Sequence, residues 1–174
     1  MQRSRAFWPL LILIWPLSGR AAAVEVPALG ISFAALPPGA SPPEVAELPA
    51  GYQMTTQLGK AVLRIYRESG AVPAGSDVAS PGYRAGLDAR FSESVRSADQ
   101  GAPTALGGYG AWTVVDARAT EGAAGTAYTC ITYVIVEQHL YRLTVNASGE
   151  PRPPEFDALV KALSAITFEP IGRT

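Results

Sequence analysis

The sequence contains one cysteine, Cys130, and one histidine, His139, among its 174 residues. A single cysteine cannot form a disulfide within the chain, so we expect the fold to be held by packing alone unless Cys130 pairs with another chain. Zinc sites normally use three or four His and Cys ligands, and the acidic residues lack the spacing of a calcium-binding loop. We therefore predict neither a metal site nor a cofactor.

Catalytic motifs are also missing. The glycines of Gly107-Gly108-Tyr109-Gly110 precede a predicted strand rather than a helix, which argues against a phosphate-binding loop. There is no G-x-S-x-G motif. Cys130 and His139 are the one candidate thiol–histidine pair, but their positions in a predicted hairpin place them roughly 20 Å apart. We predict no catalytic residues and a protein that is not an enzyme.

Charge of one sign is nowhere concentrated. The composition is 48% apolar and 17% charged with a formal net charge of −1, and the basic residues are scattered singly. Without a cationic stripe to neutralise phosphates, neither a nucleic acid nor an anionic membrane surface is expected as a partner. The composition itself is that of an ordinary globular protein.

A long apolar run occurs near the N-terminus. Arg3 and Arg5 lead into a mostly apolar stretch over residues 6–17, and Ala21-Ala22-Ala23 offers an A-x-A cleavage site. We predict a cleaved secretory signal peptide at residues 1–23, with cleavage between Ala23 and Val24, and a single domain over residues 24–174. Retention of the leader as a membrane anchor is the disfavoured alternative, because a spanning helix needs about 20 apolar residues.

The basic residues indicate the setting. Twelve of the 14 are arginine, and alanine is abundant, which favours a GC-rich bacterial coding sequence. Together with the leader, this predicts a bacterial protein that is periplasmic or secreted. Removal of residues 1–23 leaves 11 basic and 15 acidic residues, a net charge of −4.

Hydrophobic periodicity predicts alternating strands and two helices. The loops are expected at residues 36–43, which hold four prolines, and at residues 69–82. Leu87, Phe91 and Val95 recur at helical spacing, and a second helix is predicted over residues 154–165. The predicted strands cover residues 31–33, 60–67, 111–118, 126–137, 140–146 and 166–168, of which the third, fourth and fifth are expected to form an antiparallel meander.

The predicted hairpin around Gln138-His139 divides its residues between two faces. With these two residues as the turn, Glu137 lies opposite Leu140 and Val136 opposite Tyr141. We expect the final helix to cover the first face, and either the helix through Leu87 or some other element to cover the second. The first face carries Cys130, Thr132, Val134, Val136, Tyr141, Leu143 and Val145, and the second carries Ile131, Tyr133, Ile135, Glu137, Leu140, Arg142 and Thr144.

The C-terminal part of the chain resembles the PsbP-like and DcrB-like proteins. The resemblance rests on residues 141–145, a short polar loop, the helix over 154–165 and Ile166-Thr167-Phe168, and on Gly107-Gly108-Tyr109-Gly110-Ala111 opening a strand. It implies an α+β fold, an α/β/α sandwich around a mainly antiparallel sheet of about five to seven strands with two main helices. The family includes an extrinsic subunit of photosystem II, a Ran-binding nuclear import factor and bacterial envelope proteins, and most members act by binding other proteins.

The leading hypothesis is a non-catalytic periplasmic binding or accessory protein that contacts an envelope protein partner. We expect the contact at the sheet edge, at the proline-rich loop or on the face of Tyr133, Ile135 and Arg142. The alternative is a carrier of a small apolar or lipid-like ligand between sheet and helix. An enzyme of unrecognised type is the third hypothesis.

Overall fold

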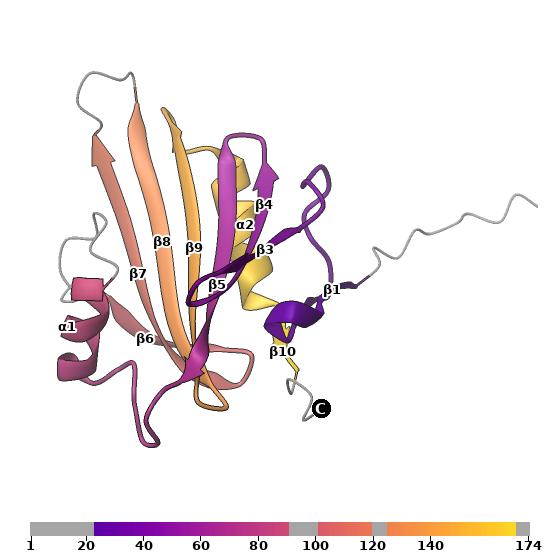
Figure 1. The fold of residues 1–174 in the computed structure, drawn as a ribbon. Coiled ribbons are helices and arrows are strands. Elements are labelled where there is room, and N and C mark those ends of the chain that lie inside the picture. The colour runs from indigo at the N-terminus through magenta and orange to yellow at the C-terminus, as the bar shows by residue number, and fades with distance from the viewer. Residues whose placement is uncertain (1–22, 91–100, 120–124, 170–174) are drawn as a thin grey trace, which may run out of the picture.

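The fold is built on a seven-stranded antiparallel sheet in the order β3-β4-β5-β9-β8-β7-β6 (Figure 1). The structure, a computed structural model, describes residues 23–90, 101–119 and 125–169. A second, three-stranded antiparallel sheet has the order β1-β2-β10. The elements are β1 (Val24–Val26), a 3₁₀ turn η1 (Pro27–Leu29), β2 (Ile31–Phe33), β3 (Glu44–Leu48), β4 (Gly51–Leu58), β5 (Ala61–Ala71), α1 (Pro81–Arg90), β6 (Ala102–Leu106), β7 (Tyr109–Ala119), β8 (Thr126–Val136), β9 (His139–Gly149), α2 (Pro154–Ser164) and β10 (Ile166–Phe168).

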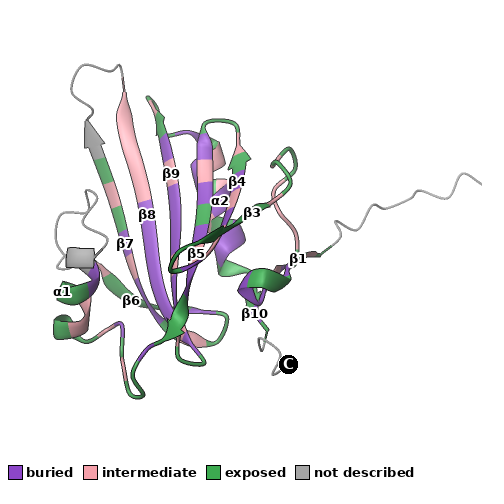
Figure 2. Cartoon of the chain, viewed as in Figure 1, coloured by how far each residue is buried: buried purple, intermediate pink, exposed green. Residues whose placement is uncertain are grey.

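One face of the large sheet, here called the inner face, packs on α2 and on the small sheet. Along the central strands every second residue points to this side, as the period of two in a strand requires, and most of these residues are apolar. The buried cluster joins residues of β4, β5, β8 and β9 to Phe156, Leu159 and Leu163 of α2 and to Phe33 and Phe168 of the small sheet. The predicted seat of the final helix is therefore confirmed. Figure 2 shows how burial concentrates on β5, β9 and β8.

The opposite or outer face is covered at one end by α1. Leu87 of α1 packs in a second buried cluster with Trp112, Tyr133 and Leu140. The Arg84 guanidinium lies 3.8 Å from the centroid of the Trp112 ring and donates a hydrogen bond to the Ala79 carbonyl oxygen. With α2 on one side and α1 on the other, the predicted α+β sandwich is present. Phe91 and Val95, also placed in this helix by the sequence, lie outside the described residues.

Several predicted boundaries need correction. The strand predicted at residues 60–67 runs from Ala61 to Ala71, because its backbone pairs with β9 beyond the last apolar residue of the pattern. The predicted loop over 69–82 is correspondingly shorter, and Pro81 begins α1, where its missing N–H costs no helical bond. The meander β7-β8-β9 and the strand at Ile166–Phe168 are confirmed. Three strands of the large sheet were not predicted at all, namely β3, β4 and β6.

The hairpin turn lies one residue earlier than predicted. Val136 pairs with His139, so the loop is Glu137-Gln138, and both residues have positive φ, 47° and 65°. This left-handed pair fits the right-handed twist of the flanking strands. Tyr141 consequently faces Val134 rather than Val136, a shift of two residues. Because a shift of two preserves the alternation, both predicted faces are correct for the residues of β8 and β9, whereas Glu137, predicted on the second face, lies in the turn.

Tyr141 connects the two sheets. Its hydroxyl donates a 2.6 Å hydrogen bond to the Leu29 carbonyl oxygen, and its ring lies 5.1 Å from that of Phe168. Burial raises the pKa of Tyr141 to about 12, although the nearby positive charge of Arg67 acts in the opposite direction. The phenol therefore stays protonated in the folded protein when it would ionise in the unfolded chain.

This raised pKa predicts a loss of stability in alkali. Between pH 10 and 12 the unfolded chain releases the Tyr141 proton and the folded protein keeps it, so the contribution is complete below pH 10 and is lost as the pH rises towards 12. A two-unit difference sets an upper limit of about 2.7 kcal/mol. The Tyr141→Phe variant should be less stable at pH 7 by about 1–3 kcal/mol, because the Leu29 carbonyl loses its donor. The variant should also lack the part of the alkaline loss of unfolding free energy that comes from ionisation of Tyr141.

Urea unfolding of both proteins at pH 8, 10 and 11.5 measures the effect. The difference in unfolding free energy between the native protein and Tyr141→Phe should shrink as the pH rises. A difference that is constant over this range would show that Tyr141 ionises as readily in the folded state as in the unfolded one.

Candidate functional site

The three residues predicted as a partner face share the outer face of β8 and β9, but they differ in their surroundings. Tyr133 is 5% exposed and lies in the cluster beneath α1, and the half-buried Ile135 packs against the same cluster. Arg142 pairs with Tyr133 across β8 and β9 but lines the part of the outer face that α1 leaves open. The accessible surface of this face therefore lies around Arg142 and extends away from Tyr133.

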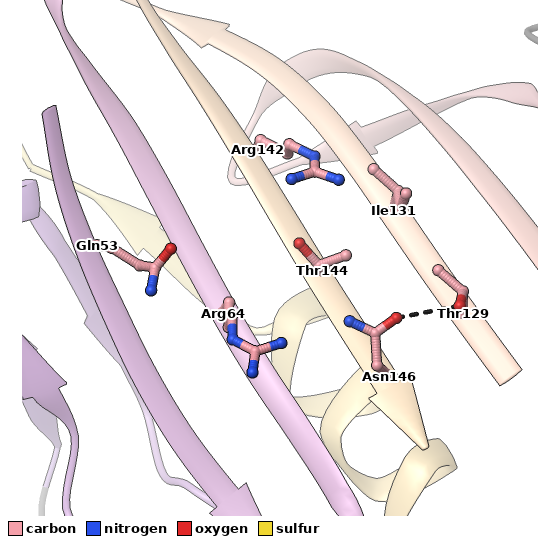
Figure 3. A pocket seen from close by; sticks show the side chains of 7 residues that line it. All are labelled: Gln53, Arg64, Thr129, Ile131, Arg142, Thr144 and Asn146. Carbon is pink, nitrogen blue, oxygen red and sulfur yellow. Dashed lines mark hydrogen bonds between the residues drawn. The ribbon is translucent and has the colours of Figure 1, made fainter. Parts of the chain in front are cut away.

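The open part of the outer face forms a hollow of about 450 Å³ that we call the basic hollow. Four strands supply its walls: β4, β5, β8 and β9 (Figure 3). Its residues alternate with the buried inner-face residues of the same strands, so the packing of the inner core fixes their direction. The lining consists of Gln53, Arg64, Thr129, Ile131, Arg142, Thr144 and Asn146.

A hydrogen bond within the basic hollow orients one of its amides. The Thr129 hydroxyl donates to Asn146 Oδ1 at 3.0 Å. Because Oδ1 is occupied, the Nδ2 group of Asn146 faces the other way, towards β5 and Arg64 (Figure 3). Arg64 pairs directly with Thr144 across β5 and β9, and Val62 pairs with Asn146, so Arg64 and Asn146 are diagonal neighbours on one face.

The charged side chains on this face differ in whether they already have an interaction partner within the protein. Arg142 already has an interaction partner within the protein, as do Glu68 and Asp116, which occupy the same face of β5 and β7. Arg64 is exposed, and over residues 23–90, 101–119 and 125–169 it has no hydrogen-bond or ion-pair partner. The guanidinium of Arg64 is therefore the cation that this site offers to solvent.

Sequence reasoning identified Arg142 but missed the rest of the basic hollow as a site. Thr144 and Ile131 were assigned to the correct face without a role. Gln53 lies on β4, which was not predicted, and Arg64 lies on a predicted strand whose neighbours were unknown. The alternation in residues 61–67 already placed Arg64 opposite the apolar face, and this was the signal available.

The structure keeps Cys130 and His139 apart. Cys130 is buried on the inner face and pairs with Val145, six residues along β9 from His139, a separation of roughly 20 Å along the strands. Burial raises the pKa of the Cys130 thiol. The predicted separation is confirmed, and it excludes a hydrogen bond between the two side chains. Among the described residues, no group of three or more His, Cys, Asp or Glu side chains is arranged to hold a metal ion.

Comparisons with known proteins give a fold but no family. No family model matches the sequence, and neither does any curated protein. Similar solved structures include a protein of Bacteroides thetaiotaomicron VPI-5482, at 9% identity and a TM-score of 0.54, with 86% of this chain and 49% of that chain covered. The chain thus spans about half the length of that protein. This likeness shows the fold alone.

A further similar structure is LpqN of Mycobacterium tuberculosis, described as involved in cell envelope biogenesis. It is 17% identical, with a TM-score of 0.44, and the match covers 80% of this chain and 83% of LpqN. No residue role is carried over from it. The resemblance to the PsbP-like and DcrB-like proteins stays a prediction, since no family model supports it. In the described part of the chain, no helix has the length and apolar character needed to cross a membrane.

Proposed function

We propose that the protein is a non-catalytic accessory protein of the bacterial envelope, periplasmic or secreted, that binds a protein partner through the basic hollow. The observation that carries this proposal is the Arg64 guanidinium, which has no partner in the described part of the chain and lies in an open, polar hollow. α1 covers one end of the outer face, and Arg64 lies in the part that remains open. This open part is the surface available to a partner.

The side chains that line the basic hollow support binding rather than catalysis. Its lining consists of two guanidiniums, two amides, two hydroxyls and one isoleucine. None of these is an activated nucleophile with an adjacent base, which covalent catalysis would need. All of them can make hydrogen bonds or apolar contacts to a docked chain.

In-cell crosslinking of the tagged protein, followed by mass spectrometry, tests the proposal. We expect one recurrent, stoichiometric partner, and we expect the Arg64→Glu variant to recover at least tenfold less of it. Arg64 is a better target than Arg142, because reversing the charge of Arg142 also breaks a contact within the protein.

Arg152→Glu is the matched control. Arg152 forms an exposed ion pair with Asp157 at 2.6 Å, next to α2 and on the other side of the sheet, and such pairs contribute less than about 1 kcal/mol. This variant should recover the partner as well as the native protein does. Equal loss in both variants, or no partner with the native protein, would contradict the proposal.

Carriage of a small apolar ligand is a second candidate, favoured by one groove. Residues 34–38 and α2 border a shallow, open apolar groove of about 390 Å³. It is lined by Ala34, Ala35, Leu36, Pro37, Pro38, Ala158, Lys161, Ala162 and Ala165. Between the large sheet and α2, where the ligand was first expected, the described residues form a pocket of about 130 Å³ near Cys130. Ligand pockets usually hold 300–1,000 Å³. Native mass spectrometry would reveal a co-purifying ligand, and Ala162→Trp should displace it.

A further inference from the structure

We infer that the basic hollow recognises a carboxylate, presented by a Glu- or Asp-rich segment of the protein partner and held between Arg64 and Asn146. The inference rests on the proposed function and names the chemistry of the partner that binds there. The juxtaposition of an unoccupied guanidinium with an oriented amide carries it.

The two donors are spaced for one small acceptor group. Arg64 and Asn146 are diagonal neighbours on adjacent strands, and such positions lie about 7–8 Å apart along a sheet. Their side chains converge in Figure 3, with the Arg64 guanidinium reaching towards β9 and the Asn146 nitrogen turned towards β5. A carboxylate between them accepts two N–H bonds from the guanidinium fork and one from Asn146 Nδ2.

The orientation of Asn146 selects for an acceptor. Its oxygen is held by the Thr129 hydroxyl, so the group that faces the space beside Arg64 is a donor. A cationic or donor-rich ligand would meet donors on both sides and would have to displace the Thr129 bond. The partner must therefore supply oxygen atoms and negative charge at this point.

The neighbouring carboxylates favour a singly charged group over a phosphate. Glu44 on β3 is on the same face, two strands from Arg64, because both residues pair with Thr55. Asp116 on β7 pairs with Thr129 on the far side of the hollow. Among the described residues Arg64 is the lining arginine without a partner, and its single positive charge balances one carboxylate, whereas a dianionic phosphate would leave a second negative charge unbalanced near Glu44.

Titration of the purified, processed protein with hexaglutamate tests the inference, with hexaglutamine and inorganic phosphate as comparison probes. The readout is the NMR shift of the Asn146 side-chain amide and of the Arg64 Nε–H. We expect hexaglutamate to shift both signals and hexaglutamine to shift neither. Phosphate at the same concentration should bind more weakly than hexaglutamate. Added salt should weaken the binding, because Arg64 is exposed.

Variants separate recognition from a structural role. Arg64→Gln should weaken hexaglutamate binding at least about tenfold, because it removes the charge and the paired N–H donors of the guanidinium. Arg64→Lys, which keeps the charge but loses the fork, should give an intermediate affinity. Asn146→Ala should also weaken binding. Arg152→Gln, which removes a charge next to α2, should leave it unchanged.

The titration tests the carboxylate inference, and the crosslinking experiment tests the proposed function. If hexaglutamate does not bind, or if phosphate binds more tightly, the carboxylate inference is overturned, even where crosslinking still yields an Arg64-dependent partner. If hexaglutamate binds as expected but crosslinking yields no partner, the proposed function fails while the chemistry of the hollow stands.

Discussion

The Phe156→Ala variant is expected to lose about 3–5 kcal/mol of unfolding free energy, the range found when a buried phenylalanine is truncated. Phe156 is 2% exposed, lies in the first turns of α2, and packs its ring 6.0 Å from that of Tyr128. It is part of the cluster that joins α2 to the inner face. Truncation leaves a cavity between two rigid elements, and neither can move without disturbing the rest of the core.

Denaturant unfolding followed by circular dichroism measures this loss. Phe156→Leu is the matched control, since it keeps most of the apolar volume and should cost clearly less than the alanine variant. A loss below about 1 kcal/mol for Phe156→Ala would mean that α2 is not held to the sheet by this side chain.

The Gly51→Ala variant is expected to lose about 3 kcal/mol, at the upper end of the cost of overpacking. A Cβ atom at Gly51 would lie 2.1 Å from the Arg67 carbonyl oxygen and 2.9 Å from Tyr66 Cε2. The carbonyl belongs to the backbone of the paired strand, and therefore cannot rotate away. The start of β4 must separate from β5, which removes hydrogen bonds at this end of the sheet.

Gly86→Ala is the control for this prediction. Nothing lies within 4 Å of a Cβ atom at Gly86, in the middle of α1, so alanine should stabilise the helix by about 0.5–1 kcal/mol. Thermal unfolding of the two variants should shift the melting temperature in opposite directions. A Gly51→Ala protein as stable as the native one would contradict the close packing of β4 on β5.

The fold was predictable where burial leaves a repeating pattern. Residues 61–67 and both strands of the β8–β9 hairpin alternate cleanly because one side packs on α2, and their faces were assigned correctly. β4 carries a similar signal in Tyr52, Met54 and Leu58, which lie on one side, and it was overlooked. β3 carries none, because all five of its residues are exposed. The turn was misplaced because Glu137-Gln138 lacks the glycine or asparagine that usually marks two positive φ angles.

The candidate site was less predictable because strand pairing assembles it. Gln53, Arg64 and Asn146 are separated widely in sequence and meet only through the pairing of β4 with β5 and of β5 with β9. The covering of Tyr133 by α1 is a tertiary contact of the same kind. Local alternation predicts which side of a strand a residue faces, but it does not predict the neighbouring strand.

The two edge strands of the large sheet, β3 and β6, are poorly suited to pairing with a partner, so we expect a partner on a face of the sheet and not at its edge. β3 is only five residues long, carries Glu44 and Glu47, and lies between Pro43 and Pro49. β6 contains Pro103, which has no N–H to offer. Short, charged and proline-bearing edges resist the addition of another strand. We therefore do not expect copies of this protein to join edge to edge into fibres, even at high protein concentration.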